Sequence, residues 1–162
     1  MNECFTKVTI IQRRLTHYRG TLFEKLQDNL QNYGIKLRLL IGMPSSDELQ
    51  RKDSIIIPWA ESIPTYYFFR NRLCWQPIHR YVYDSDLVIV TQENSLLANH
   101  LLILCPRKKY KVAFWGHGAN FQSNKPNGFS ERYKRWLAKR VDWWFAYTQL
   151  SAEIVNKTGY SV

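Results

Sequence analysis

The sequence predicts an α/β fold, namely a Rossmann-like, doubly wound and mainly parallel sheet with helices on both of its faces. Two observations lead to this prediction. Short runs of β-branched residues alternate along the chain with longer segments of helical periodicity. Helices of ten or more residues between strands also indicate parallel crossover connections. We therefore expect one domain over residues 1–162, with ligands bound beyond the carboxyl ends of the strands.

Six segments have the composition of strands. The first is a β-branched run after a polar N-terminus, and the fourth is apolar along its whole length, so we expect the fourth to be buried on both faces. The six predicted strands are residues 7–12, 35–41, 54–57, 86–91, 111–115 and 142–147.

The segments between these strands are predicted to be helices or loops. Thr21 and Glu24 have the spacing of a capping box, and Gly34 stands where a helix would end. A helix is therefore expected from about Thr21 to Gly34. Residues 45–53 are polar and predicted to be a loop, while 59–83 is aromatic and irregular. The further predicted helices are residues 75 onward, 95–105, 129–141 and 151–157.

Composition indicates a folded domain with a basic surface. Of the 162 residues, 45% are hydrophobic, which suffices for a substantial core. Lys and Arg number 23 against 13 acidic residues, a formal net charge of +10 that favours nucleic acid, an anionic membrane surface or a phosphorylated substrate. No apolar run reaches the roughly 18 residues of a membrane-spanning helix. The N-terminus also lacks the apolar segment of a signal peptide, so we expect a cytoplasmic protein.

The loop after the first predicted strand places cations and a histidine before a helix. It contains His17, Tyr18, Arg19 and Gly20 but no GxGxxG pattern, which disfavours a dinucleotide site. Cations at a helix N-terminus favour the binding of anionic groups. The alternative is a solvated basic loop with Gly20 as a turn residue. Because the loop follows the carboxyl end of a strand, a functional role is favoured.

A histidine between two glycines follows the fifth predicted strand. Gly116, His117 and Gly118 would leave the imidazole exposed and the backbone open to close approach. Asn120 and its polar neighbours add the neutral donors and acceptors that sugar hydroxyls require. We expect His117 to be functional, although a structural histidine is the alternative.

The short loop after the fourth predicted strand carries Glu93 and Asn94. These two side chains could hydrogen-bond a polyol, and the carboxylate could assist a proton transfer. Equally, Asn94 or Ser95 could simply cap the next helix. The sequence leaves both interpretations open.

Metal binding is not expected. Asp84 and Asp86 resemble a DxD motif, but they precede a strand instead of following it, so we interpret them as loop and strand-entry residues. Cys4, Cys74 and Cys105 are widely spaced and form no CxxC pair, so we expect reduced cysteines with neither a disulfide framework nor a zinc site.

The predicted helix over residues 129–141 is basic and amphipathic. The apolar face of such a helix usually packs on the core, and its basic residues lie on the opposite face, in solvent. Its charges could still attract anionic lipid headgroups.

Four segments together resemble the N-terminal half of a family-four glycosyltransferase with the GT-B fold. They are residues 10–20, 86–94, 114–118 and 140–148, in the family's order and over nearly the whole chain. The resemblance implies two Rossmann-like domains with the active site between them. This chain would be the acceptor domain, and a nucleotide-sugar-binding domain with paired glutamates would follow Val162.

The resemblance also implies an activity: transfer of a sugar from a nucleotide-sugar co-substrate to a glycan or lipid-linked acceptor, with retention and without a metal or other cofactor. In similar enzymes a histidine at the position of His117 contacts the transferred sugar. Their glycine-rich turn near the donor phosphates is reduced here to Gly20. We expect a peripheral protein on the inner face of an anionic membrane, no nucleic-acid partner, and no transfer by this half alone.

Two other functions are alternatives. One is a non-enzymatic basic α/β module that binds nucleic acid or another phosphorylated partner; however, the basic residues are scattered and no known recognition signature is present. The other is a nucleotide- or phosphate-binding α/β protein complete at this length. The residues after 159 begin what would be another strand, which argues against it.

Overall fold

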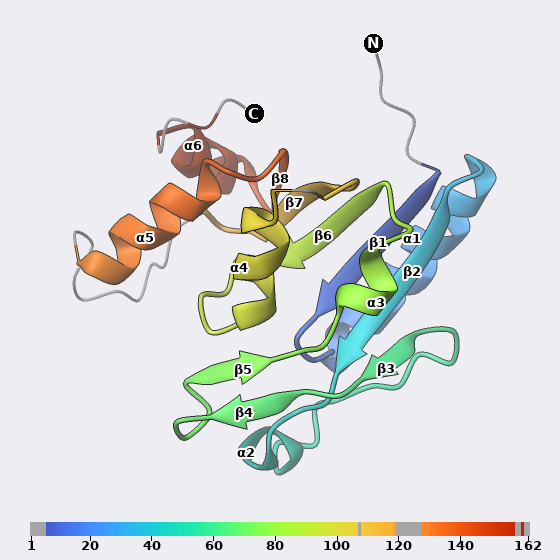
Figure 1. Ribbon diagram of the computed structural model, residues 1–162. Coiled ribbons are helices and arrows are strands. Elements are labelled where there is room, and N and C mark those ends of the chain that lie inside the picture. The colour runs from blue at the N-terminus through green and yellow to red at the C-terminus, as the bar shows by residue number, and fades with distance from the viewer. Residues whose placement is uncertain (1–5, 107, 119–127, 158–159, 161–162) are drawn as a thin grey trace.

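A six-stranded parallel sheet forms the centre of the computed structural model, which describes residues 6–106, 108–118, 128–157 and 160 (Figure 1). The strand order is β3-β2-β1-β6-β7-β8, and every neighbouring pair is parallel. This is the predicted Rossmann-like α/β fold. Its strands are β1 (Lys7–Gln12), β2 (Lys36–Gly42), β3 (Glu61–Ile63), β6 (Leu87–Thr91), β7 (Lys111–Gly116) and β8 (Trp143–Ala146).

Helices connect the parallel strands. The crossover helices are α1 (Gly20–Asn32) between β1 and β2, α4 (Leu97–Leu104) between β6 and β7, and α5 (Phe129–Ala138) between β7 and β8. Helix α6 (Gln149–Lys157) follows β8. Shorter elements complete the fold, namely η1 (His17–Arg19), α2 (Ser46–Leu49), α3 (His79–Val82) and a separate antiparallel hairpin of β4 (Tyr66–Phe68) and β5 (Leu73–Trp75).

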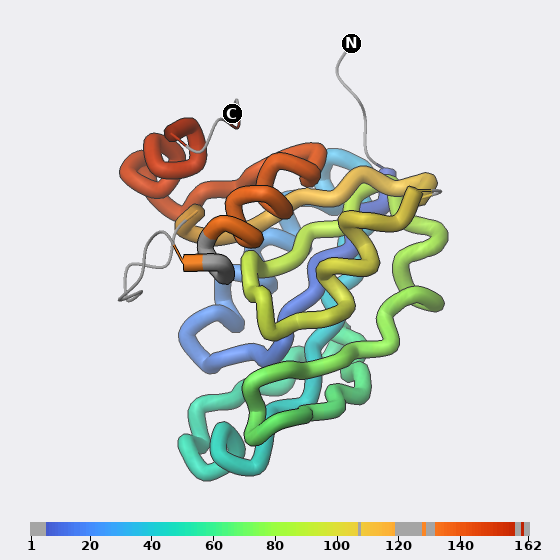
Figure 2. The backbone as a smooth tube through the Cα atoms, turned by 60° about the vertical axis from the view of Figure 1, so that its left-hand side comes forward, coloured from blue at the N-terminus to red at the C-terminus, as the bar shows by residue number. Residues whose placement is uncertain are grey.

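The core has two parts, one on each face of the sheet. Alternate residues of β1 supply both, since successive side chains of a strand point to opposite faces. Val8 and Ile10 belong to the cluster that includes Phe23 of α1, whereas Ile11 belongs to the cluster that includes Leu102 of α4 and Leu137 of α5. The tube view in Figure 2 shows α4 and α5 together over the same side of the sheet. Helices therefore cover both faces, as the sequence predicts.

Asp84 and Asp86 hold the amino ends of β1 and β6 together. Asp86 Oδ2 accepts hydrogen bonds of 2.8 Å from the Lys7 backbone N–H and from Thr6 Oγ1, while Asp84 forms ion pairs with Lys7 and Arg38. The hydrogen bond from the Lys7 side chain lowers the pKa of Asp84, and the hydrogen bond from Thr6 lowers the pKa of Asp86. These are the loop and strand-entry roles that the sequence predicts.

Helix α1 begins differently from the prediction. The capping box at Thr21 and Glu24 is wrong, because the helix starts at Gly20 with Arg19 as its N-cap and without a side-chain cap. The preceding η1 turn provides the partners: the Arg19 N–H donates to the Thr16 carbonyl at 3.0 Å, and the Gly20 N–H donates to the His17 carbonyl. A side-chain cap is therefore not needed there.

The end of α1 agrees with the prediction. Gly34 follows the C-cap Tyr33 with φ +70°, a left-handed conformation that glycine adopts without strain.

The predicted strand at residues 54–57 is wrong. Only Ser54 makes an isolated bridge, to Thr16, and β3 is the strand that pairs with β2 at this edge of the sheet. Ile57 is instead buried in the core cluster of α1, and Ile55 packs on the same cluster. These β-branched residues thus fill the layer under the helix and do not extend the sheet.

Two further segments differ from the prediction. Residues 45–53 are not all loop, because Ser45 and Glu48 form a capping box that starts α2. The helix expected from about residue 75 onward is only the four-residue α3, and the β4–β5 hairpin lies before it.

Candidate functional site

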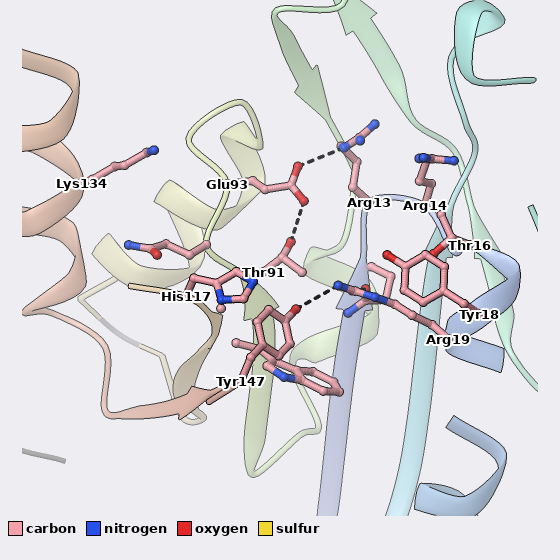
Figure 3. A pocket seen from close by; sticks show the side chains of 14 residues that line it. Arg13, Arg14, Thr16, Tyr18, Arg19, Thr91, Glu93, His117, Lys134 and Tyr147 are labelled. Carbon is pink, nitrogen blue, oxygen red and sulfur yellow. Dashed lines mark hydrogen bonds and ion pairs between the residues drawn. The ribbon is translucent and has the colours of Figure 1, made fainter. Parts of the chain in front are cut away.

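A polar cavity of about 350 Å³ lies at the carboxyl edge of the sheet, between the loops that follow β1 and β6 (Figure 3). The chain leaves β1 toward α1 and β6 toward α4, which cover opposite faces, so a crevice opens between the two loops. The cavity is lined by Gln12, Arg13, Arg14, Thr16, Tyr18, Arg19, Thr91, Gln92, Glu93, Trp115, Gly116, His117, Lys134 and Tyr147.

Several residues named from the sequence line this cavity together. They come from the loops that follow the first, fourth and fifth predicted strands, although those loops are far apart in the chain. They are Tyr18, Arg19, Glu93, Gly116 and His117.

The other named residues lie outside the lining. His17 is exposed, with its backbone N–H donating to the Asp53 carbonyl at 2.8 Å. Gly20 is the first residue of α1 and packs under Ile55, so it does not line the cavity, nor is it the turn residue of the alternative interpretation. The Asn94 carbonyl accepts a hydrogen bond from His100 Nε2 at 3.0 Å.

Gly118 also lies outside the lining, and Asn120 falls outside the described residues. Gly118 has φ +78° and packs so closely on α6 that an added Cβ would lie 2.6 Å from Val155 Cγ2. It therefore supports the turn after His117 and not the cavity wall.

The His117 imidazole is exposed, as predicted, and its orientation is fixed by two neighbours. Its Nδ1 lies 3.1 Å from Ser151 Oγ, and its ring centroid lies 4.6 Å from that of Tyr147. Ser151 is buried and is itself bonded to Thr148 Oγ1 at 3.0 Å. The start of α6 thus holds the side chain that β7 presents to the cavity.

Arg13 joins the two loops across the crevice. Its Nε donates to Glu93 Oε2 at 3.0 Å, and its Nη1 donates to Glu48 Oε1 at 2.8 Å. Glu93 Oε1 in turn accepts from Thr91 Oγ1 at 3.2 Å. Burial alone would lower the pKa of Arg13, but the charge of Glu93 and the hydrogen bond to Glu48 outweigh it and raise the pKa.

Glu48 and Asp53 hold the arginines of the loop that follows β1. Burial works to raise the pKa of Glu48, yet hydrogen bonds from the Ser45 backbone and from Arg13 keep it below its ordinary value. Arg14 Nη1 donates to Asp53 Oδ1 at 2.8 Å, and this hydrogen bond lowers the pKa of Asp53. Arg14 Nε also pairs with Glu48 at 3.1 Å.

Reasoning from the sequence did not name several lining residues. Gln12 is a polar residue at the end of a buried strand, and Tyr147 directly follows β8. Both lie at the carboxyl ends of parallel strands, where ligands bind in this fold, and that position is the signal that the sequence offers for them. Lys134 comes from α5, and only the tertiary structure places it beside the cavity.

A second, smaller cavity of about 240 Å³ shares Arg13 and Glu93 with the first. Its lining includes the buried Cys74, whose pKa is raised by burial to about 11. A thiol that remains protonated at neutral pH is a weak nucleophile. Cys74 is therefore a packing residue.

Within the described part of the chain, no three His, Cys, Asp or Glu residues lie together in a way that could hold a metal ion. None of the described helices is long and apolar enough to cross a membrane. Comparison with known protein families finds no matching family model, and comparison with curated protein sequences finds no match.

Proposed function

We propose that this chain is the acceptor-side half of a GT-B glycosyltransferase that resembles family four. It would move a sugar from a nucleotide sugar to a glycan or lipid-linked acceptor, with retention of configuration. The nucleotide would be held mainly by a second domain outside these 162 residues. We also propose that the basic surface attaches the protein to the inner face of an anionic membrane.

One observation carries the proposal: an oriented imidazole lies in a polar cavity at the carboxyl edge of a Rossmann-like sheet. His117 is held by Ser151 and faces a space that Glu93 and Arg19 also line. Imidazole, carboxylate and guanidinium groups can hydrogen-bond sugar hydroxyls and phosphate oxygens.

The proposed mechanism assigns a positioning task to His117. As the bond to the leaving phosphate breaks, positive charge develops on the sugar ring and negative charge on the phosphate. An imidazole held at Nδ1 by Ser151 can hydrogen-bond a hydroxyl of the sugar and keep its ring in the reactive orientation. Such positioning commonly contributes about 10²-fold or more to the rate.

The test is a transfer assay on the protein expressed from its complete reading frame, with a panel of nucleotide sugars and release of nucleoside diphosphate as the readout. We expect His117→Ala to lower turnover about 100-fold while the affinity for the nucleotide changes little. His79→Ala is the matched control, since His79 is an exposed histidine of α3 outside the cavity lining. Unchanged turnover in His117→Ala, or no turnover of any nucleotide sugar by the wild type, would contradict the proposal.

A further inference from the structure

Arg19 differs from the two other arginines of its loop in the partners that it contacts. Its Nη1 donates to Gln12 Oε1 at 3.0 Å, and its Nη2 donates to the Tyr147 hydroxyl at 3.1 Å. Both partners are neutral, and among the described residues no carboxylate pairs with Arg19. Arg13 and Arg14, in contrast, each form ion pairs. The loop therefore presents one guanidinium in the cavity wall whose charge no described carboxylate balances.

Gln12 supplies a second, independent observation. Its side chain lines the cavity and is only 2% exposed, yet its Nε2 has no hydrogen-bond partner in the described structure. Nearly all buried donors in proteins have a partner, so an orphaned one needs an explanation. Because Oε1 of the same amide binds Arg19, the orphaned N–H group lies next to the guanidinium.

Two neighbouring groups also favour a negatively charged ligand. The Tyr147 hydroxyl accepts from Arg19, so its own proton can be donated to a further acceptor. Helix α1 starts immediately after Arg19 and has no acidic residue in its first turn. The positive end of its macrodipole is thus not neutralised by the helix itself.

We propose that Arg19, Gln12 and Tyr147 form a binding site for one oxyanion, a phosphate or carboxylate group carried by the substrate. This inference rests on the proposed function and specifies which side chains of this chain hold an anionic group of the donor or of the acceptor. The anion would accept hydrogen bonds from the guanidinium, from the orphaned amide and from the phenol. Glu93 does not compete with the anion for these three donors, because its two carboxylate oxygens accept hydrogen bonds from Arg13 and Thr91.

The experiment measures binding of inorganic phosphate to the 162-residue chain by calorimetry at low salt. We expect Arg19→Gln to weaken phosphate binding about tenfold to a hundredfold, as the loss of charged hydrogen bonds predicts. Gln12→Glu places a carboxylate beside Arg19 and should weaken phosphate binding as strongly. Thermal melting establishes that both variants are folded.

The matched control is Arg70→Gln, which removes the same charge at the exposed tip of the β4–β5 hairpin. It should bind phosphate as the wild type does. Uridine diphosphate, glucose 1-phosphate and glucuronate then separate the two sources of the anion. Uridine diphosphate and glucose 1-phosphate are both fragments of a nucleotide sugar, so a loss confined to these two assigns the site to the donor. A loss with glucuronate assigns it to the acceptor.

Wild-type phosphate affinity in folded Arg19→Gln and Gln12→Glu would overturn the site. An equal loss in Arg70→Gln would overturn it too, because only net charge would then matter. The proposed function can fail separately. If both site variants lose phosphate binding but the wild type turns over no nucleotide sugar, the oxyanion site stands and sugar transfer does not.

Discussion

At the scale of single residues, Arg13 is the link between the two loops that form the cavity. It contacts Glu93 on one side and Glu48 on the other, and its side chain is only 22% exposed. Removing one partner of a half-buried ion pair leaves the other charge poorly solvated, which is more damaging than the loss of a surface pair. The geometry of the cavity therefore depends on Glu48, which lies outside the lining, as well as on the lining residue Glu93.

We expect Glu48→Gln to lower the free energy of unfolding by about 1–3 kcal/mol, because it removes charged hydrogen bonds to Arg13 and an ion pair with Arg14. Urea denaturation measures this as a lower midpoint with an unchanged slope. Glu24→Gln, on the exposed side of α1, makes the same chemical change and should shift stability by less than about 0.5 kcal/mol. Equal shifts in the two variants would contradict the role assigned to Glu48.

The same substitution predicts a pH dependence. The pKa of Glu48 in the folded protein lies below its ordinary value, near 4.3 in unfolded chains. Its contribution to stability is therefore fully present above that pH and is lost as the pH falls through the folded pKa. The difference in unfolding free energy between wild type and Glu48→Gln should be constant between about pH 6 and 8 and shrink below about pH 4. A difference that grows in acid would contradict this.

Single residues also show what sequence reasoning could reach. His117 could be named because its glycine neighbours and its place after a strand are visible in the sequence. The orphaned amide of Gln12 could not, because a missing hydrogen-bond partner exists only in the packed structure. Lys134 was missed for the same reason, since a helix position reveals no distance to a distant loop.

At the scale of elements, the central strands were predictable and the edge was not. β1, β6 and β7 are buried on both faces or nearly so, and their short runs of mainly apolar residues predict them directly. The run at residues 54–57 has the same composition, but it packs under α1 while the less regular β3 takes the edge position. Local composition cannot distinguish these two ways of burying an isoleucine.

Gly42, the last residue of β2, has no room for a side chain. A Cβ added there would collide with the Gln76 amide and with the Arg13 carbonyl oxygen. Gly42→Ala should therefore lower stability by about 3 kcal/mol through overpacking. Gly34→Ala is the control, since φ is +70° there but open space surrounds the glycine, so backbone strain alone should cost about 1 kcal/mol. Thermal or urea unfolding that shows no larger loss at Gly42 would contradict the close packing of β2 on the Arg13 loop.

At the scale of the whole molecule, the topology places the cavity. The strand order turns back between β1 and β6, and the loops after these two strands meet at one edge although 80 residues separate Arg13 from Glu93. The loop after β7 and the residue after β8 reach the same edge because all four strands are parallel. A sequence that predicts this topology also predicts where its ligand site should lie.

The location of the ligand site can be measured by an amide NMR titration of the 162-residue chain with glucose 1-phosphate, which carries both a sugar and an oxyanion. We expect the largest shift changes at Arg19, Gly116, His117 and Tyr147, with little change in α3 or at the hairpin tip, residues 69–71. Largest changes in those two distant segments, or no change at about 10 mM ligand, would contradict the assignment of the carboxyl-edge cavity as the functional site.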